Sequence, residues 1–226
     1  MVLSTQLLFG LGLTFFTALA FTGFMVLAGI TDVPNARSAH SRPIATAGGI
    51  GIVAGLGAGL LFMARYSGAD LLQYQIGPII SLIFAVAILG LVDDIHNLSP
   101  RLKLCLIAVF SGLAIWLIGP PQGLMLGEAV INLPIAAAFI GAMLWVFTVT
   151  NTVNFMDGSN GLMGLVMMVA SFAMIGVAIA CSAPNAALLG GVLTAAIFGF
   201  LPYNFRRKAQ IFSGDVGALC LSLIHI

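Results

Sequence analysis

The chain has 226 residues, of which 61% are hydrophobic and only 7% are charged. Its formal net charge is +1 and its mean hydropathy is +1.15. A soluble domain usually carries charge on about a quarter of its residues, so this composition excludes an ordinary solvated surface. The long charge-poor stretches each supply the roughly 20 apolar residues that a helix needs to cross a bilayer. We therefore predict an all-α, polytopic integral membrane protein.

Apolar segments predict seven complete transmembrane helices and a truncated eighth that begins near Val216. The complete spans cover residues 7–30, 44–64, 76–92, 102–118, 135–150, 162–181 and 186–202. The first segment is a retained span rather than a signal peptide, because it lacks a basic n-region and its apolar run exceeds about 15 residues. Glycines of the second span, such as Gly55 and Gly59, are expected to let helices approach closely. The three scattered cysteines indicate neither a disulfide framework nor a metal site.

Basic residues are distributed unevenly between the loops that alternate across the membrane. Seven of the eight lie after spans one, three, five and seven: Arg37, Arg42, Arg101, Lys103, Arg206, Arg207 and Lys208. Cytoplasmic loops carry an excess of Lys and Arg, so these loops are predicted to be cytoplasmic and the N-terminus to lie outside. The same loops hold five of the seven acidic residues: Asp32, Asp93, Asp94, Asp157 and Asp215. The chemistry is therefore predicted to lie on the cytoplasmic face.

The first predicted cytoplasmic segment, residues 32–49, is a basic loop that re-enters a helix at paired glycines. Its Arg37, His40 and Arg42 suit phosphate, since Arg makes forked contacts with phosphate oxygens. An ordinary basic anchor beside the membrane is the alternative interpretation.

The second segment contains Asp93 and Asp94 at the C-terminal end of the third span. The helix dipole disfavours anions at that end, so we predict a cation beside them: Arg101, Lys103 or a metal ion. Adjacent helical residues diverge by about 100°, so the two carboxylates are expected to face different groups. A plain pair of interfacial acids is the alternative.

The third segment, TNTVNFMDGSNGLMG at residues 150–164, interrupts two apolar spans with polar residues and glycines. Asn151, Asn154 and Asp157 recur at intervals of three, so a continued helix would place them on nearly one stripe. Their oxygens are hard ligands of the kind that Mg²⁺ accepts. A helix that begins after the glycine turn would direct its amide N–H groups at an anion. A loop of turn-forming residues is the alternative.

The fourth segment, residues 200–218, carries Asn204, a basic run and a Ser-Gly-Asp turn that ends at Asp215. A basic run beside a membrane is most often a topology signal or a ligand of lipid head groups. That interpretation does not account for the Ser-Gly-Asp turn.

Together, the four segments resemble the polyprenyl-phosphate N-acetylhexosamine-1-phosphate transferases, a glycosyltransferase family 4 type related to the phospho-N-acetylmuramoyl-pentapeptide translocase. The family pattern is D-x-P-N-x-R-S-x-H-x-x-P, then D-D-x-x-D/N, then N-x-x-N-F-x-D-G-x-D/N-G-L, then a basic loop with F-x-G-D-x-G-S. Residues 32–43, 93–97, 151–162 and 212–218 match it in this order. The chain departs from the commonest residues of the pattern at four positions: Asn97, Asn160, Ser213 and Ala218.

The resemblance implies transfer of an N-acetylhexosamine 1-phosphate from a UDP-sugar to undecaprenyl phosphate, with release of UMP, as the first membrane step of cell-envelope polysaccharide synthesis. It implies a Mg²⁺ cofactor, with Mn²⁺ as a substitute, and a place in the bacterial inner membrane. The implied partners are the two substrates and the lipid bilayer; a homodimer stays open, and no nucleic acid is expected. A polytopic secondary transporter is the alternative, although transporters place ionisable groups near the membrane midplane and these lie at span ends.

On this resemblance we assign Asp157 as the principal Mg²⁺ ligand, supported by Asn154. Asp93 is the predicted group that handles the proton of the lipid phosphate, with Asp94 second. The predicted substrate-binding residues are Asp32, Asn35, Arg37, His40, Asn151, Asn154, Asn204, Arg206, Arg207, Lys208 and Asp215.

The resemblance also calls for further spans after residue 218 and for a cytoplasmic loop with a histidine that contacts the nucleotide sugar. We therefore expect residues 1–220 to be an incomplete transferase domain without activity of its own. The ending LSLIHI, residues 221–226, resembles a translated transposon-end sequencing adapter, so His225 is not expected to be the loop histidine. Codons other than CTG-TCT-CTT-ATA-CAC-ATC in the source DNA would refute the adapter origin.

Overall fold

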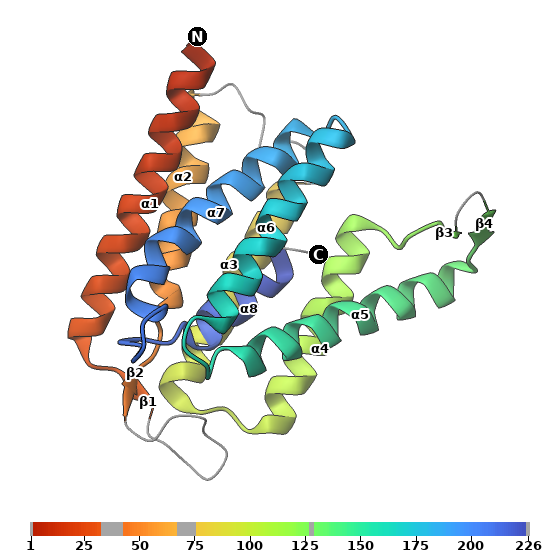
Figure 1. The fold of residues 1–226 in the computed structure, drawn as a ribbon. Helices are drawn as coiled ribbons and strands as arrows, with labels where there is room; N and C mark the ends of the chain where they lie inside the picture. The colour runs from red at the N-terminus through yellow and green to blue at the C-terminus, as the bar shows by residue number, and fades with distance from the viewer. Residues whose placement is uncertain (1, 33–42, 67–75, 127–128, 225–226) are drawn as a thin grey trace.

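The computed structural model describes residues 2–32, 43–66, 76–126 and 129–224, and helices dominate it (Figure 1). The helices are α1 (Val2–Ala28), α2 (Gly49–Tyr66), α3 (Ile76–His96), α4 (Pro100–Ile118), α5 (Ile135–Met156), α6 (Leu162–Ala180), α7 (Pro184–Asn204) and α8 (Gly214–Ile224). In the described residues, α1 to α7 are long and apolar enough to cross a membrane, and α8 is a shorter apolar helix. The predicted polytopic, helical architecture is confirmed.

Two helices continue beyond their predicted ends, into the polar residues of the motifs. Helix α3 extends to His96 rather than residue 92, and α5 extends to Met156 rather than residue 150. Asp93, Asp94 and Asn154 have partners on other elements, and the helical backbone continues through them. As a result, Asp93, Asp94 and Asn154 project from helix ends and not from loops.

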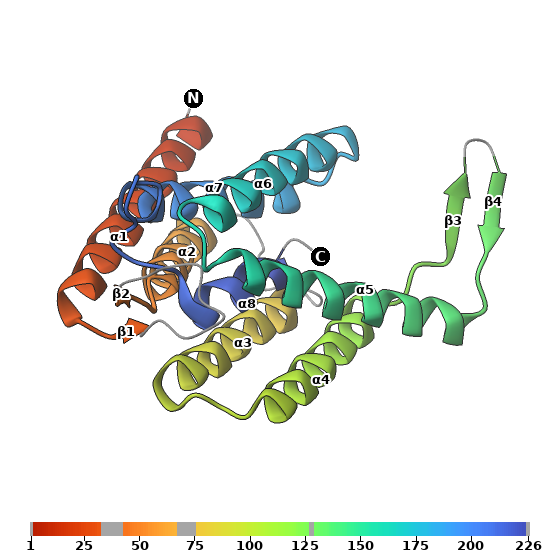
Figure 2. The ribbon, with the colours of Figure 1, turned by 60° about the horizontal axis from the view of Figure 1, so that its bottom comes forward.

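Short β-ladders, which were not predicted, connect some of the helices. Strands β1 (Thr31–Asp32) and β2 (Ile44–Ala45) pair antiparallel between α1 and α2. Strands β3 (Gly123–Leu126) and β4 (Ala129–Asn132) form a hairpin between α4 and α5. Figure 2 shows this hairpin projecting away from the helices. In these ladders, backbone N–H and C=O groups that lie outside the helices find hydrogen-bond partners in the neighbouring strand.

The buried core centres on α2, which packs against α1, α7 and α8, and small residues allow the close contacts there. A Cβ atom added at Gly55 of α2 would lie 2.7 Å from the carbonyl oxygen of Thr14 in α1. One added at Gly59 would lie 2.0 Å from the Oγ1 of Thr14. The predicted packing role of these glycines is therefore confirmed. All the described side chains of α8 are buried except Asp215, which is partly exposed.

The four motif segments meet at one end of the helical bundle, because the fourth segment contacts each of the others. The N–H of Phe212 donates to the carbonyl oxygen of Ala45 at 2.8 Å, in the first segment. The N–H groups of Ser213 and Asp215 donate to carboxylates of the third and second segments. For the described residues, the prediction that these segments share one side is confirmed.

Candidate active site

Helix α8 begins in the middle of this polar end, at Gly214. The segment before it is fixed by the start of α2, since the N–H groups of Gly48 and Gly49 donate to the carbonyl oxygens of Phe212 and Ser213 at 2.9 and 2.8 Å. Gly214 has φ +69°, a conformation that favours glycine. A Cβ atom there would also lie 2.9 Å from the backbone nitrogen of Ala47. The chain can therefore turn into α8 here only with glycine.

Two aspartates from other helices bind the first amides of α8. Asp157, at the end of α5, accepts hydrogen bonds from the N–H of Ser213 at 3.0 Å and of Gly214 at 2.7 Å, one at each carboxylate oxygen. Asp94 of α3 accepts from the N–H of Asp215 at 2.8 Å and of Val216 at 3.2 Å. A helix N-terminus leaves its first amides without intrahelical partners and carries partial positive charge, so carboxylates suit this position.

A second set of contacts gathers around Lys103 of α4. Its Nζ atom lies 2.9 Å from the Oδ2 of Asp93, and it also pairs with the Oδ2 of Asp215. The side-chain nitrogen of Asn154 donates to the other oxygen of Asp215. The remaining oxygen of Asp93 accepts from the N–H of Leu98 at 2.7 Å. Residues from α3, α4, α5 and α8 thus converge on one cluster.

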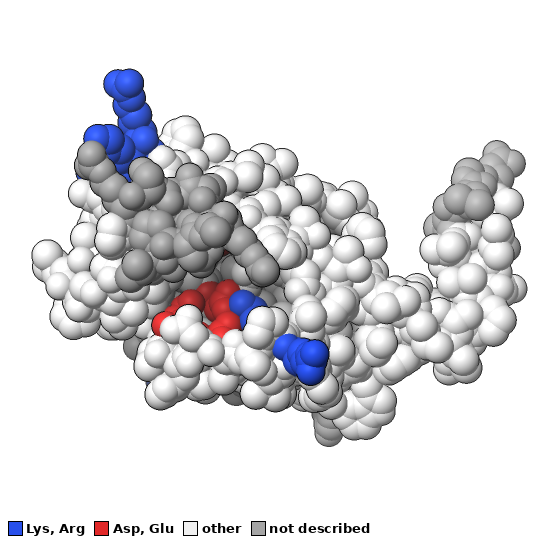
Figure 3. Space-filling view, turned by 90° about the horizontal axis from the view of Figure 1, so that it is seen from below, with Lys and Arg blue, Asp and Glu red and all other residues white. Residues whose placement is uncertain are grey.

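The cluster has an excess of negative charge. Within the described residues it contains the carboxylates of Asp93, Asp94, Asp157 and Asp215 and the ammonium of Lys103. Figure 3 shows acidic side chains in a hollow of this face, with basic atoms beside them. Burial raises the pKa of Asp157 to about 6, because the charged form loses its hydration, although the hydrogen bonds from Ser213 and Gly214 oppose this shift. Such a site favours an additional cation.

The donor set of the cluster is compatible with Mg²⁺ when a substrate phosphate completes it. Among the described residues, no three His, Cys, Asp or Glu side chains are placed to hold a metal by themselves. Mg²⁺ usually takes only one or two protein carboxylates together with substrate phosphate and water, which suits this site. Asp215 and Asn154 fit best, because their side chains converge and a 180° turn of the amide would present its oxygen beside the carboxylate. Asp157 fits less well, since each of its oxygens already binds a backbone N–H.

The structure brings five of the predicted site residues together: Asp93, Asp94, Asn154, Asp157 and Asp215. The predicted divergence of the adjacent aspartates is confirmed, because Asp93 faces Lys103 whereas Asp94 faces the start of α8. The cation predicted beside them is Lys103 for Asp93. Asp94 instead accepts hydrogen bonds from the N-terminal amides of α8, which take the place of the predicted cation.

Other predicted residues lie away from the cluster or make internal contacts. Asn151 donates to the carbonyl oxygen of Phe147 on its own helix at 2.7 Å, so it does not join Asn154 and Asp157. Asn204 is buried; its amide oxygen accepts from the N–H of Gly161 at 3.1 Å and its nitrogen donates to the carbonyl oxygen of Ile211 at 2.9 Å.

The remaining predictions concern the basic run and the first segment. Asp32 lies in β1, opposite Ile44 of β2. The side chains of the basic run are exposed: Arg206, Arg207 and Lys208. Three predicted residues lie outside the described part of the chain: Asn35, Arg37 and His40.

Sequence reasoning missed two features of the site. The sequence predicts Lys103 only as a possible cation beside the aspartates, not as a residue of the site. Its positive charge near the end of an apolar helix could have indicated a role in the site. The helix N-terminus inside the cluster belongs to α8 and not to α6, which starts after the glycine turn. The N–H of Gly161, just before α6, is bound by Asn204. No local pattern indicated which N-terminus the aspartates would meet.

The fold and the site define a polytopic membrane protein with an acidic, lysine-containing site at one end of its helical bundle. Residues 76–226 match the model of glycosyl transferase family 4, and the chain belongs to this family. It is 28% identical over 199 residues to a Bacillus subtilis protein named "Probable undecaprenyl-phosphate N-acetylglucosaminyl 1-phosphate transferase", which covers 85% of this chain and 52% of the relative.

Two further relatives carry different names. The chain is 27% identical over 214 residues to the decaprenyl-phosphate N-acetylglucosaminephosphotransferase of Mycobacterium tuberculosis, covering 87% of this chain and 52% of the relative. It is 33% identical over 160 residues to the phospho-N-acetylmuramoyl-pentapeptide-transferase of Symbiobacterium thermophilum, covering 63% and 48%. The chain therefore spans about half the length of the curated relatives that it matches.

Proposed function

We propose that the protein carrying this sequence transfers an N-acetylhexosamine 1-phosphate from a UDP-sugar to a polyprenyl phosphate such as undecaprenyl phosphate, and releases UMP. The observation that carries the proposal is the cluster of Asp93, Lys103, Asn154 and Asp215 at the end of apolar helices. The relatives named as undecaprenyl- and decaprenyl-phosphate N-acetylglucosamine transferases support it.

In this reaction an oxygen of the lipid phosphate attacks the phosphorus that bears the sugar. A new P–O bond forms to the lipid, and the P–O bond to UMP breaks. Several negative charges meet during the attack, and Lys103 is the most exposed of the three ion-paired side chains, with 24% of its side chain exposed against 15% for Asp215. We assign Lys103 to the phosphate oxygens and Asp93 to the proton of the lipid phosphate.

We propose that Asp215 and Asn154 hold Mg²⁺, in place of the Asp157 and Asn154 pair predicted from the sequence. The preference for Asp215 rests on its partners, which are side chains that can move, whereas the partners of Asp157 are backbone amides. When bound, the ion neutralises diphosphate charge and polarises the phosphorus under attack.

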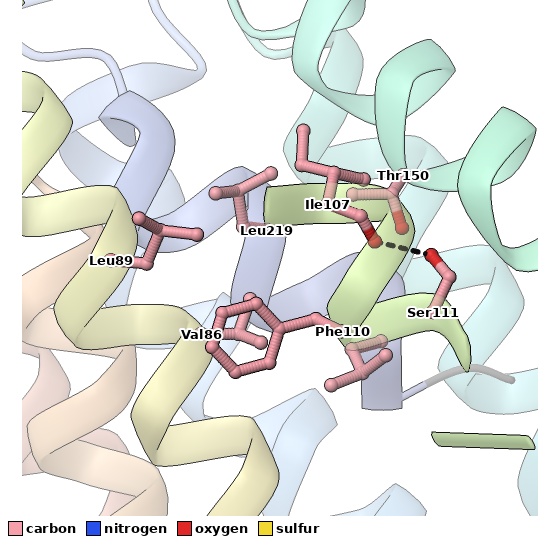
Figure 4. Close-up of a pocket in the computed structure, with 8 residues that line it drawn as sticks. Val86, Leu89, Ile107, Phe110, Ser111, Thr150 and Leu219 are labelled. Atoms are coloured by element: carbon pink, nitrogen blue, oxygen red, sulfur yellow. Dashed lines mark hydrogen bonds between the residues drawn. The ribbon is translucent and has the colours of Figure 1, made fainter. Parts of the chain in front are cut away.

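An apolar pocket beside the cluster supports a lipid substrate. It has only about 10 Å³ of free volume and is lined by Val86, Leu89, Ile107, Phe110, Ser111, Thr150, Leu219 and Leu223 (Figure 4). The hydroxyl of Ser111 donates to the carbonyl oxygen of Ile107 at 2.7 Å, so the lining is mostly hydrocarbon. Leu89 and Leu219 each lie one helical turn from a cluster aspartate. We propose that the first isoprene units of the lipid lie across the mouth of this pocket, which is too small to enclose them.

The uneven distribution of basic residues supports a cytoplasmic site and an external N-terminus. The bacterial relatives support a place in the bacterial inner (plasma) membrane. A cytoplasmic site would meet the soluble nucleotide sugar while the polyprenyl tail stays in the bilayer.

The test is UMP release by a full-length protein that carries this sequence, reconstituted in lipid. UMP should appear only when a UDP-N-acetylhexosamine, undecaprenyl phosphate and Mg²⁺ are all present, and radiolabelled sugar phosphate should enter the lipid fraction. UMP release that does not depend on the lipid phosphate would refute the proposal, and so would the absence of release with every UDP-N-acetylhexosamine tested.

A further inference from the structure

We infer that Asp94 and Asp157 are positioning residues that hold the first turn of α8, so that the Asp215 carboxylate faces Lys103 and Asn154. The kinetic part of this inference rests on the proposed transferase function. The hydrogen bonds themselves stand without it. Both aspartates thereby receive a role different from the chemical one that their motifs predict.

The hydrogen bonds form a continuous cap. Four consecutive amides, from Ser213 to Val216, each donate to one carboxylate oxygen, at 3.0, 2.7, 2.8 and 3.2 Å. A helix usually receives such a cap from the side chain just before its first turn. Here that residue is Ser213, whose hydroxyl donates to the carbonyl oxygen of Gly214 at 3.1 Å. The cap is supplied by α3 and α5, so it joins three helices.

The cap fixes the residue that the site depends on. Asp94 binds the backbone N–H of Asp215, while Lys103 and Asn154 bind its side chain. Helix α3 also contacts the backbone of α8, since a Cβ atom added at Gly90 would lie 2.5 Å from the carbonyl carbon and oxygen of Asp215. A shift of α8 would therefore carry the Asp215 carboxylate with it. Misplacement by about 1 Å in an active site can cost about a hundredfold in rate.

The capping carboxylates, those of Asp94 and Asp157, differ from that of Asp93 in their hydrogen-bond partners. Each oxygen of Asp94 and Asp157 accepts a backbone N–H, whereas one oxygen of Asp93 pairs with the side-chain ammonium of Lys103. Replacement of either capping aspartate by Asn would set an NH₂ group against a backbone N–H, and two donors repel. Replacement by Glu would keep both acceptor oxygens on a longer side chain.

Amide hydrogen exchange of the membrane-inserted chain tests the cap without any assay of activity. We expect Asp94→Asn and Asp157→Asn to speed exchange in the peptide that covers residues 211–218 by about tenfold or more, the size expected for the loss of a hydrogen bond to a charged group. Asp93→Asn is the matched control and should leave this peptide unchanged. Protection of α7 reports intact folding. Wild-type exchange at 211–218 in both capping variants would overturn the inference.

UMP release by the full-length protein tests the positioning role, with Asp, Glu, Asn and Ala compared at each of positions 94 and 157. We expect activity to fall in step with the loss of amide protection and to be partly rescued by Glu. At position 93, activity should fall while protection stays unchanged. If protection is lost at 94 or 157 but UMP release stays within about twofold of wild type, the positioning role is wrong. The Glu variants keep the comparison available if the Asn variants do not fold. A wild-type protein without UMP release would contradict the proposed function and leave the exchange result standing.

Discussion

At the scale of single residues, Lys103 is the cation shared by two carboxylates of the site. It pairs with Asp93 and Asp215, which come from helices α3 and α8, and 24% of its side chain is exposed. Partial exposure leaves the ammonium able to meet a substrate phosphate without losing its place between the aspartates. Arg101, two residues earlier, is exposed and provides a natural comparison.

We expect Lys103→Met to reduce UMP release by the full-length protein about a hundredfold or more, the size expected for removal of one charged group that stabilises a transition state. Methionine keeps most of the side-chain length, so the change isolates the charge. Lys103→Arg should retain part of the activity, and Arg101→Met should stay within about twofold of wild type. Equal losses in Lys103→Met and Arg101→Met would show that only the overall charge of the face matters.

At the scale of elements, the start of α8 depends on one glycine. Gly214 has φ +69°, and a Cβ atom there would lie 2.4 Å from the Oδ2 of Asp94 and 2.8 Å from the Oγ1 of Thr46. The backbone nitrogen of Ala47, just before α2, would lie 2.9 Å from the same Cβ atom, so the crowding cannot be relieved by a side-chain rotation alone. This single residue controls how α8 enters the site.

We expect Gly214→Ala to lower the free energy of unfolding by about 2 kcal/mol or more, because strain and overpacking add at this position. Thermal unfolding in detergent, followed by the fluorescence of Trp116 and Trp145, measures the effect. Gly141→Ala is the control, since a Cβ atom at Gly141 of α5 meets nothing within 4 Å. It should leave the midpoint unchanged. Equal unfolding midpoints for Gly214→Ala and Gly141→Ala would show that the conformation of Gly214 does not contribute to stability.

Asn204 acts at the same scale, because it joins the end of α7 to the start of α6 and to the segment before α8. Asn204→Leu keeps the branched shape and the number of side-chain heavy atoms but leaves the N–H of Gly161 and the carbonyl oxygen of Ile211 without this partner. We expect the free energy of unfolding to fall by about 2 kcal/mol or more. The exposed Asn160→Leu should change it by about 0.5 kcal/mol or less. A stable Asn204→Leu variant with a raised KM would instead support the substrate-binding role predicted from the sequence.

At the scale of the whole molecule, the loops after alternate spans gather at one end, and this arrangement defines an experiment on topology. In a background without the native cysteines, Arg101→Cys and Gln210→Cys should react with an impermeant thiol reagent only from the cytoplasm. Asn132→Cys, exposed in β4, should react only from outside. Reaction of Arg101→Cys from outside would contradict both the proposed orientation and a cytoplasmic site.

The class of protein, the seven long spans and the segments that meet at the site could all be predicted from the sequence. These properties depend on local quantities: the length of apolar runs, the alternation of loops across a bilayer, and helical spacing. The pairing of Asp93 with Lys103 was also within reach, because the two residues flank one short turn between α3 and α4.

The tertiary structure alone decided what the other carboxylates do. Asp157 meets the N–H of Ser213 across 56 residues of sequence, and Asp94 meets that of Asp215 across 121. Helical periodicity tells which face a side chain occupies, but it carries no information about which distant helix end adjoins that face. A carboxylate that binds a helix N-terminus and one that binds a metal ion look the same in a motif. Only the packing of α3, α5 and α8 distinguishes them, because it brings unpaired backbone amides to the carboxylates.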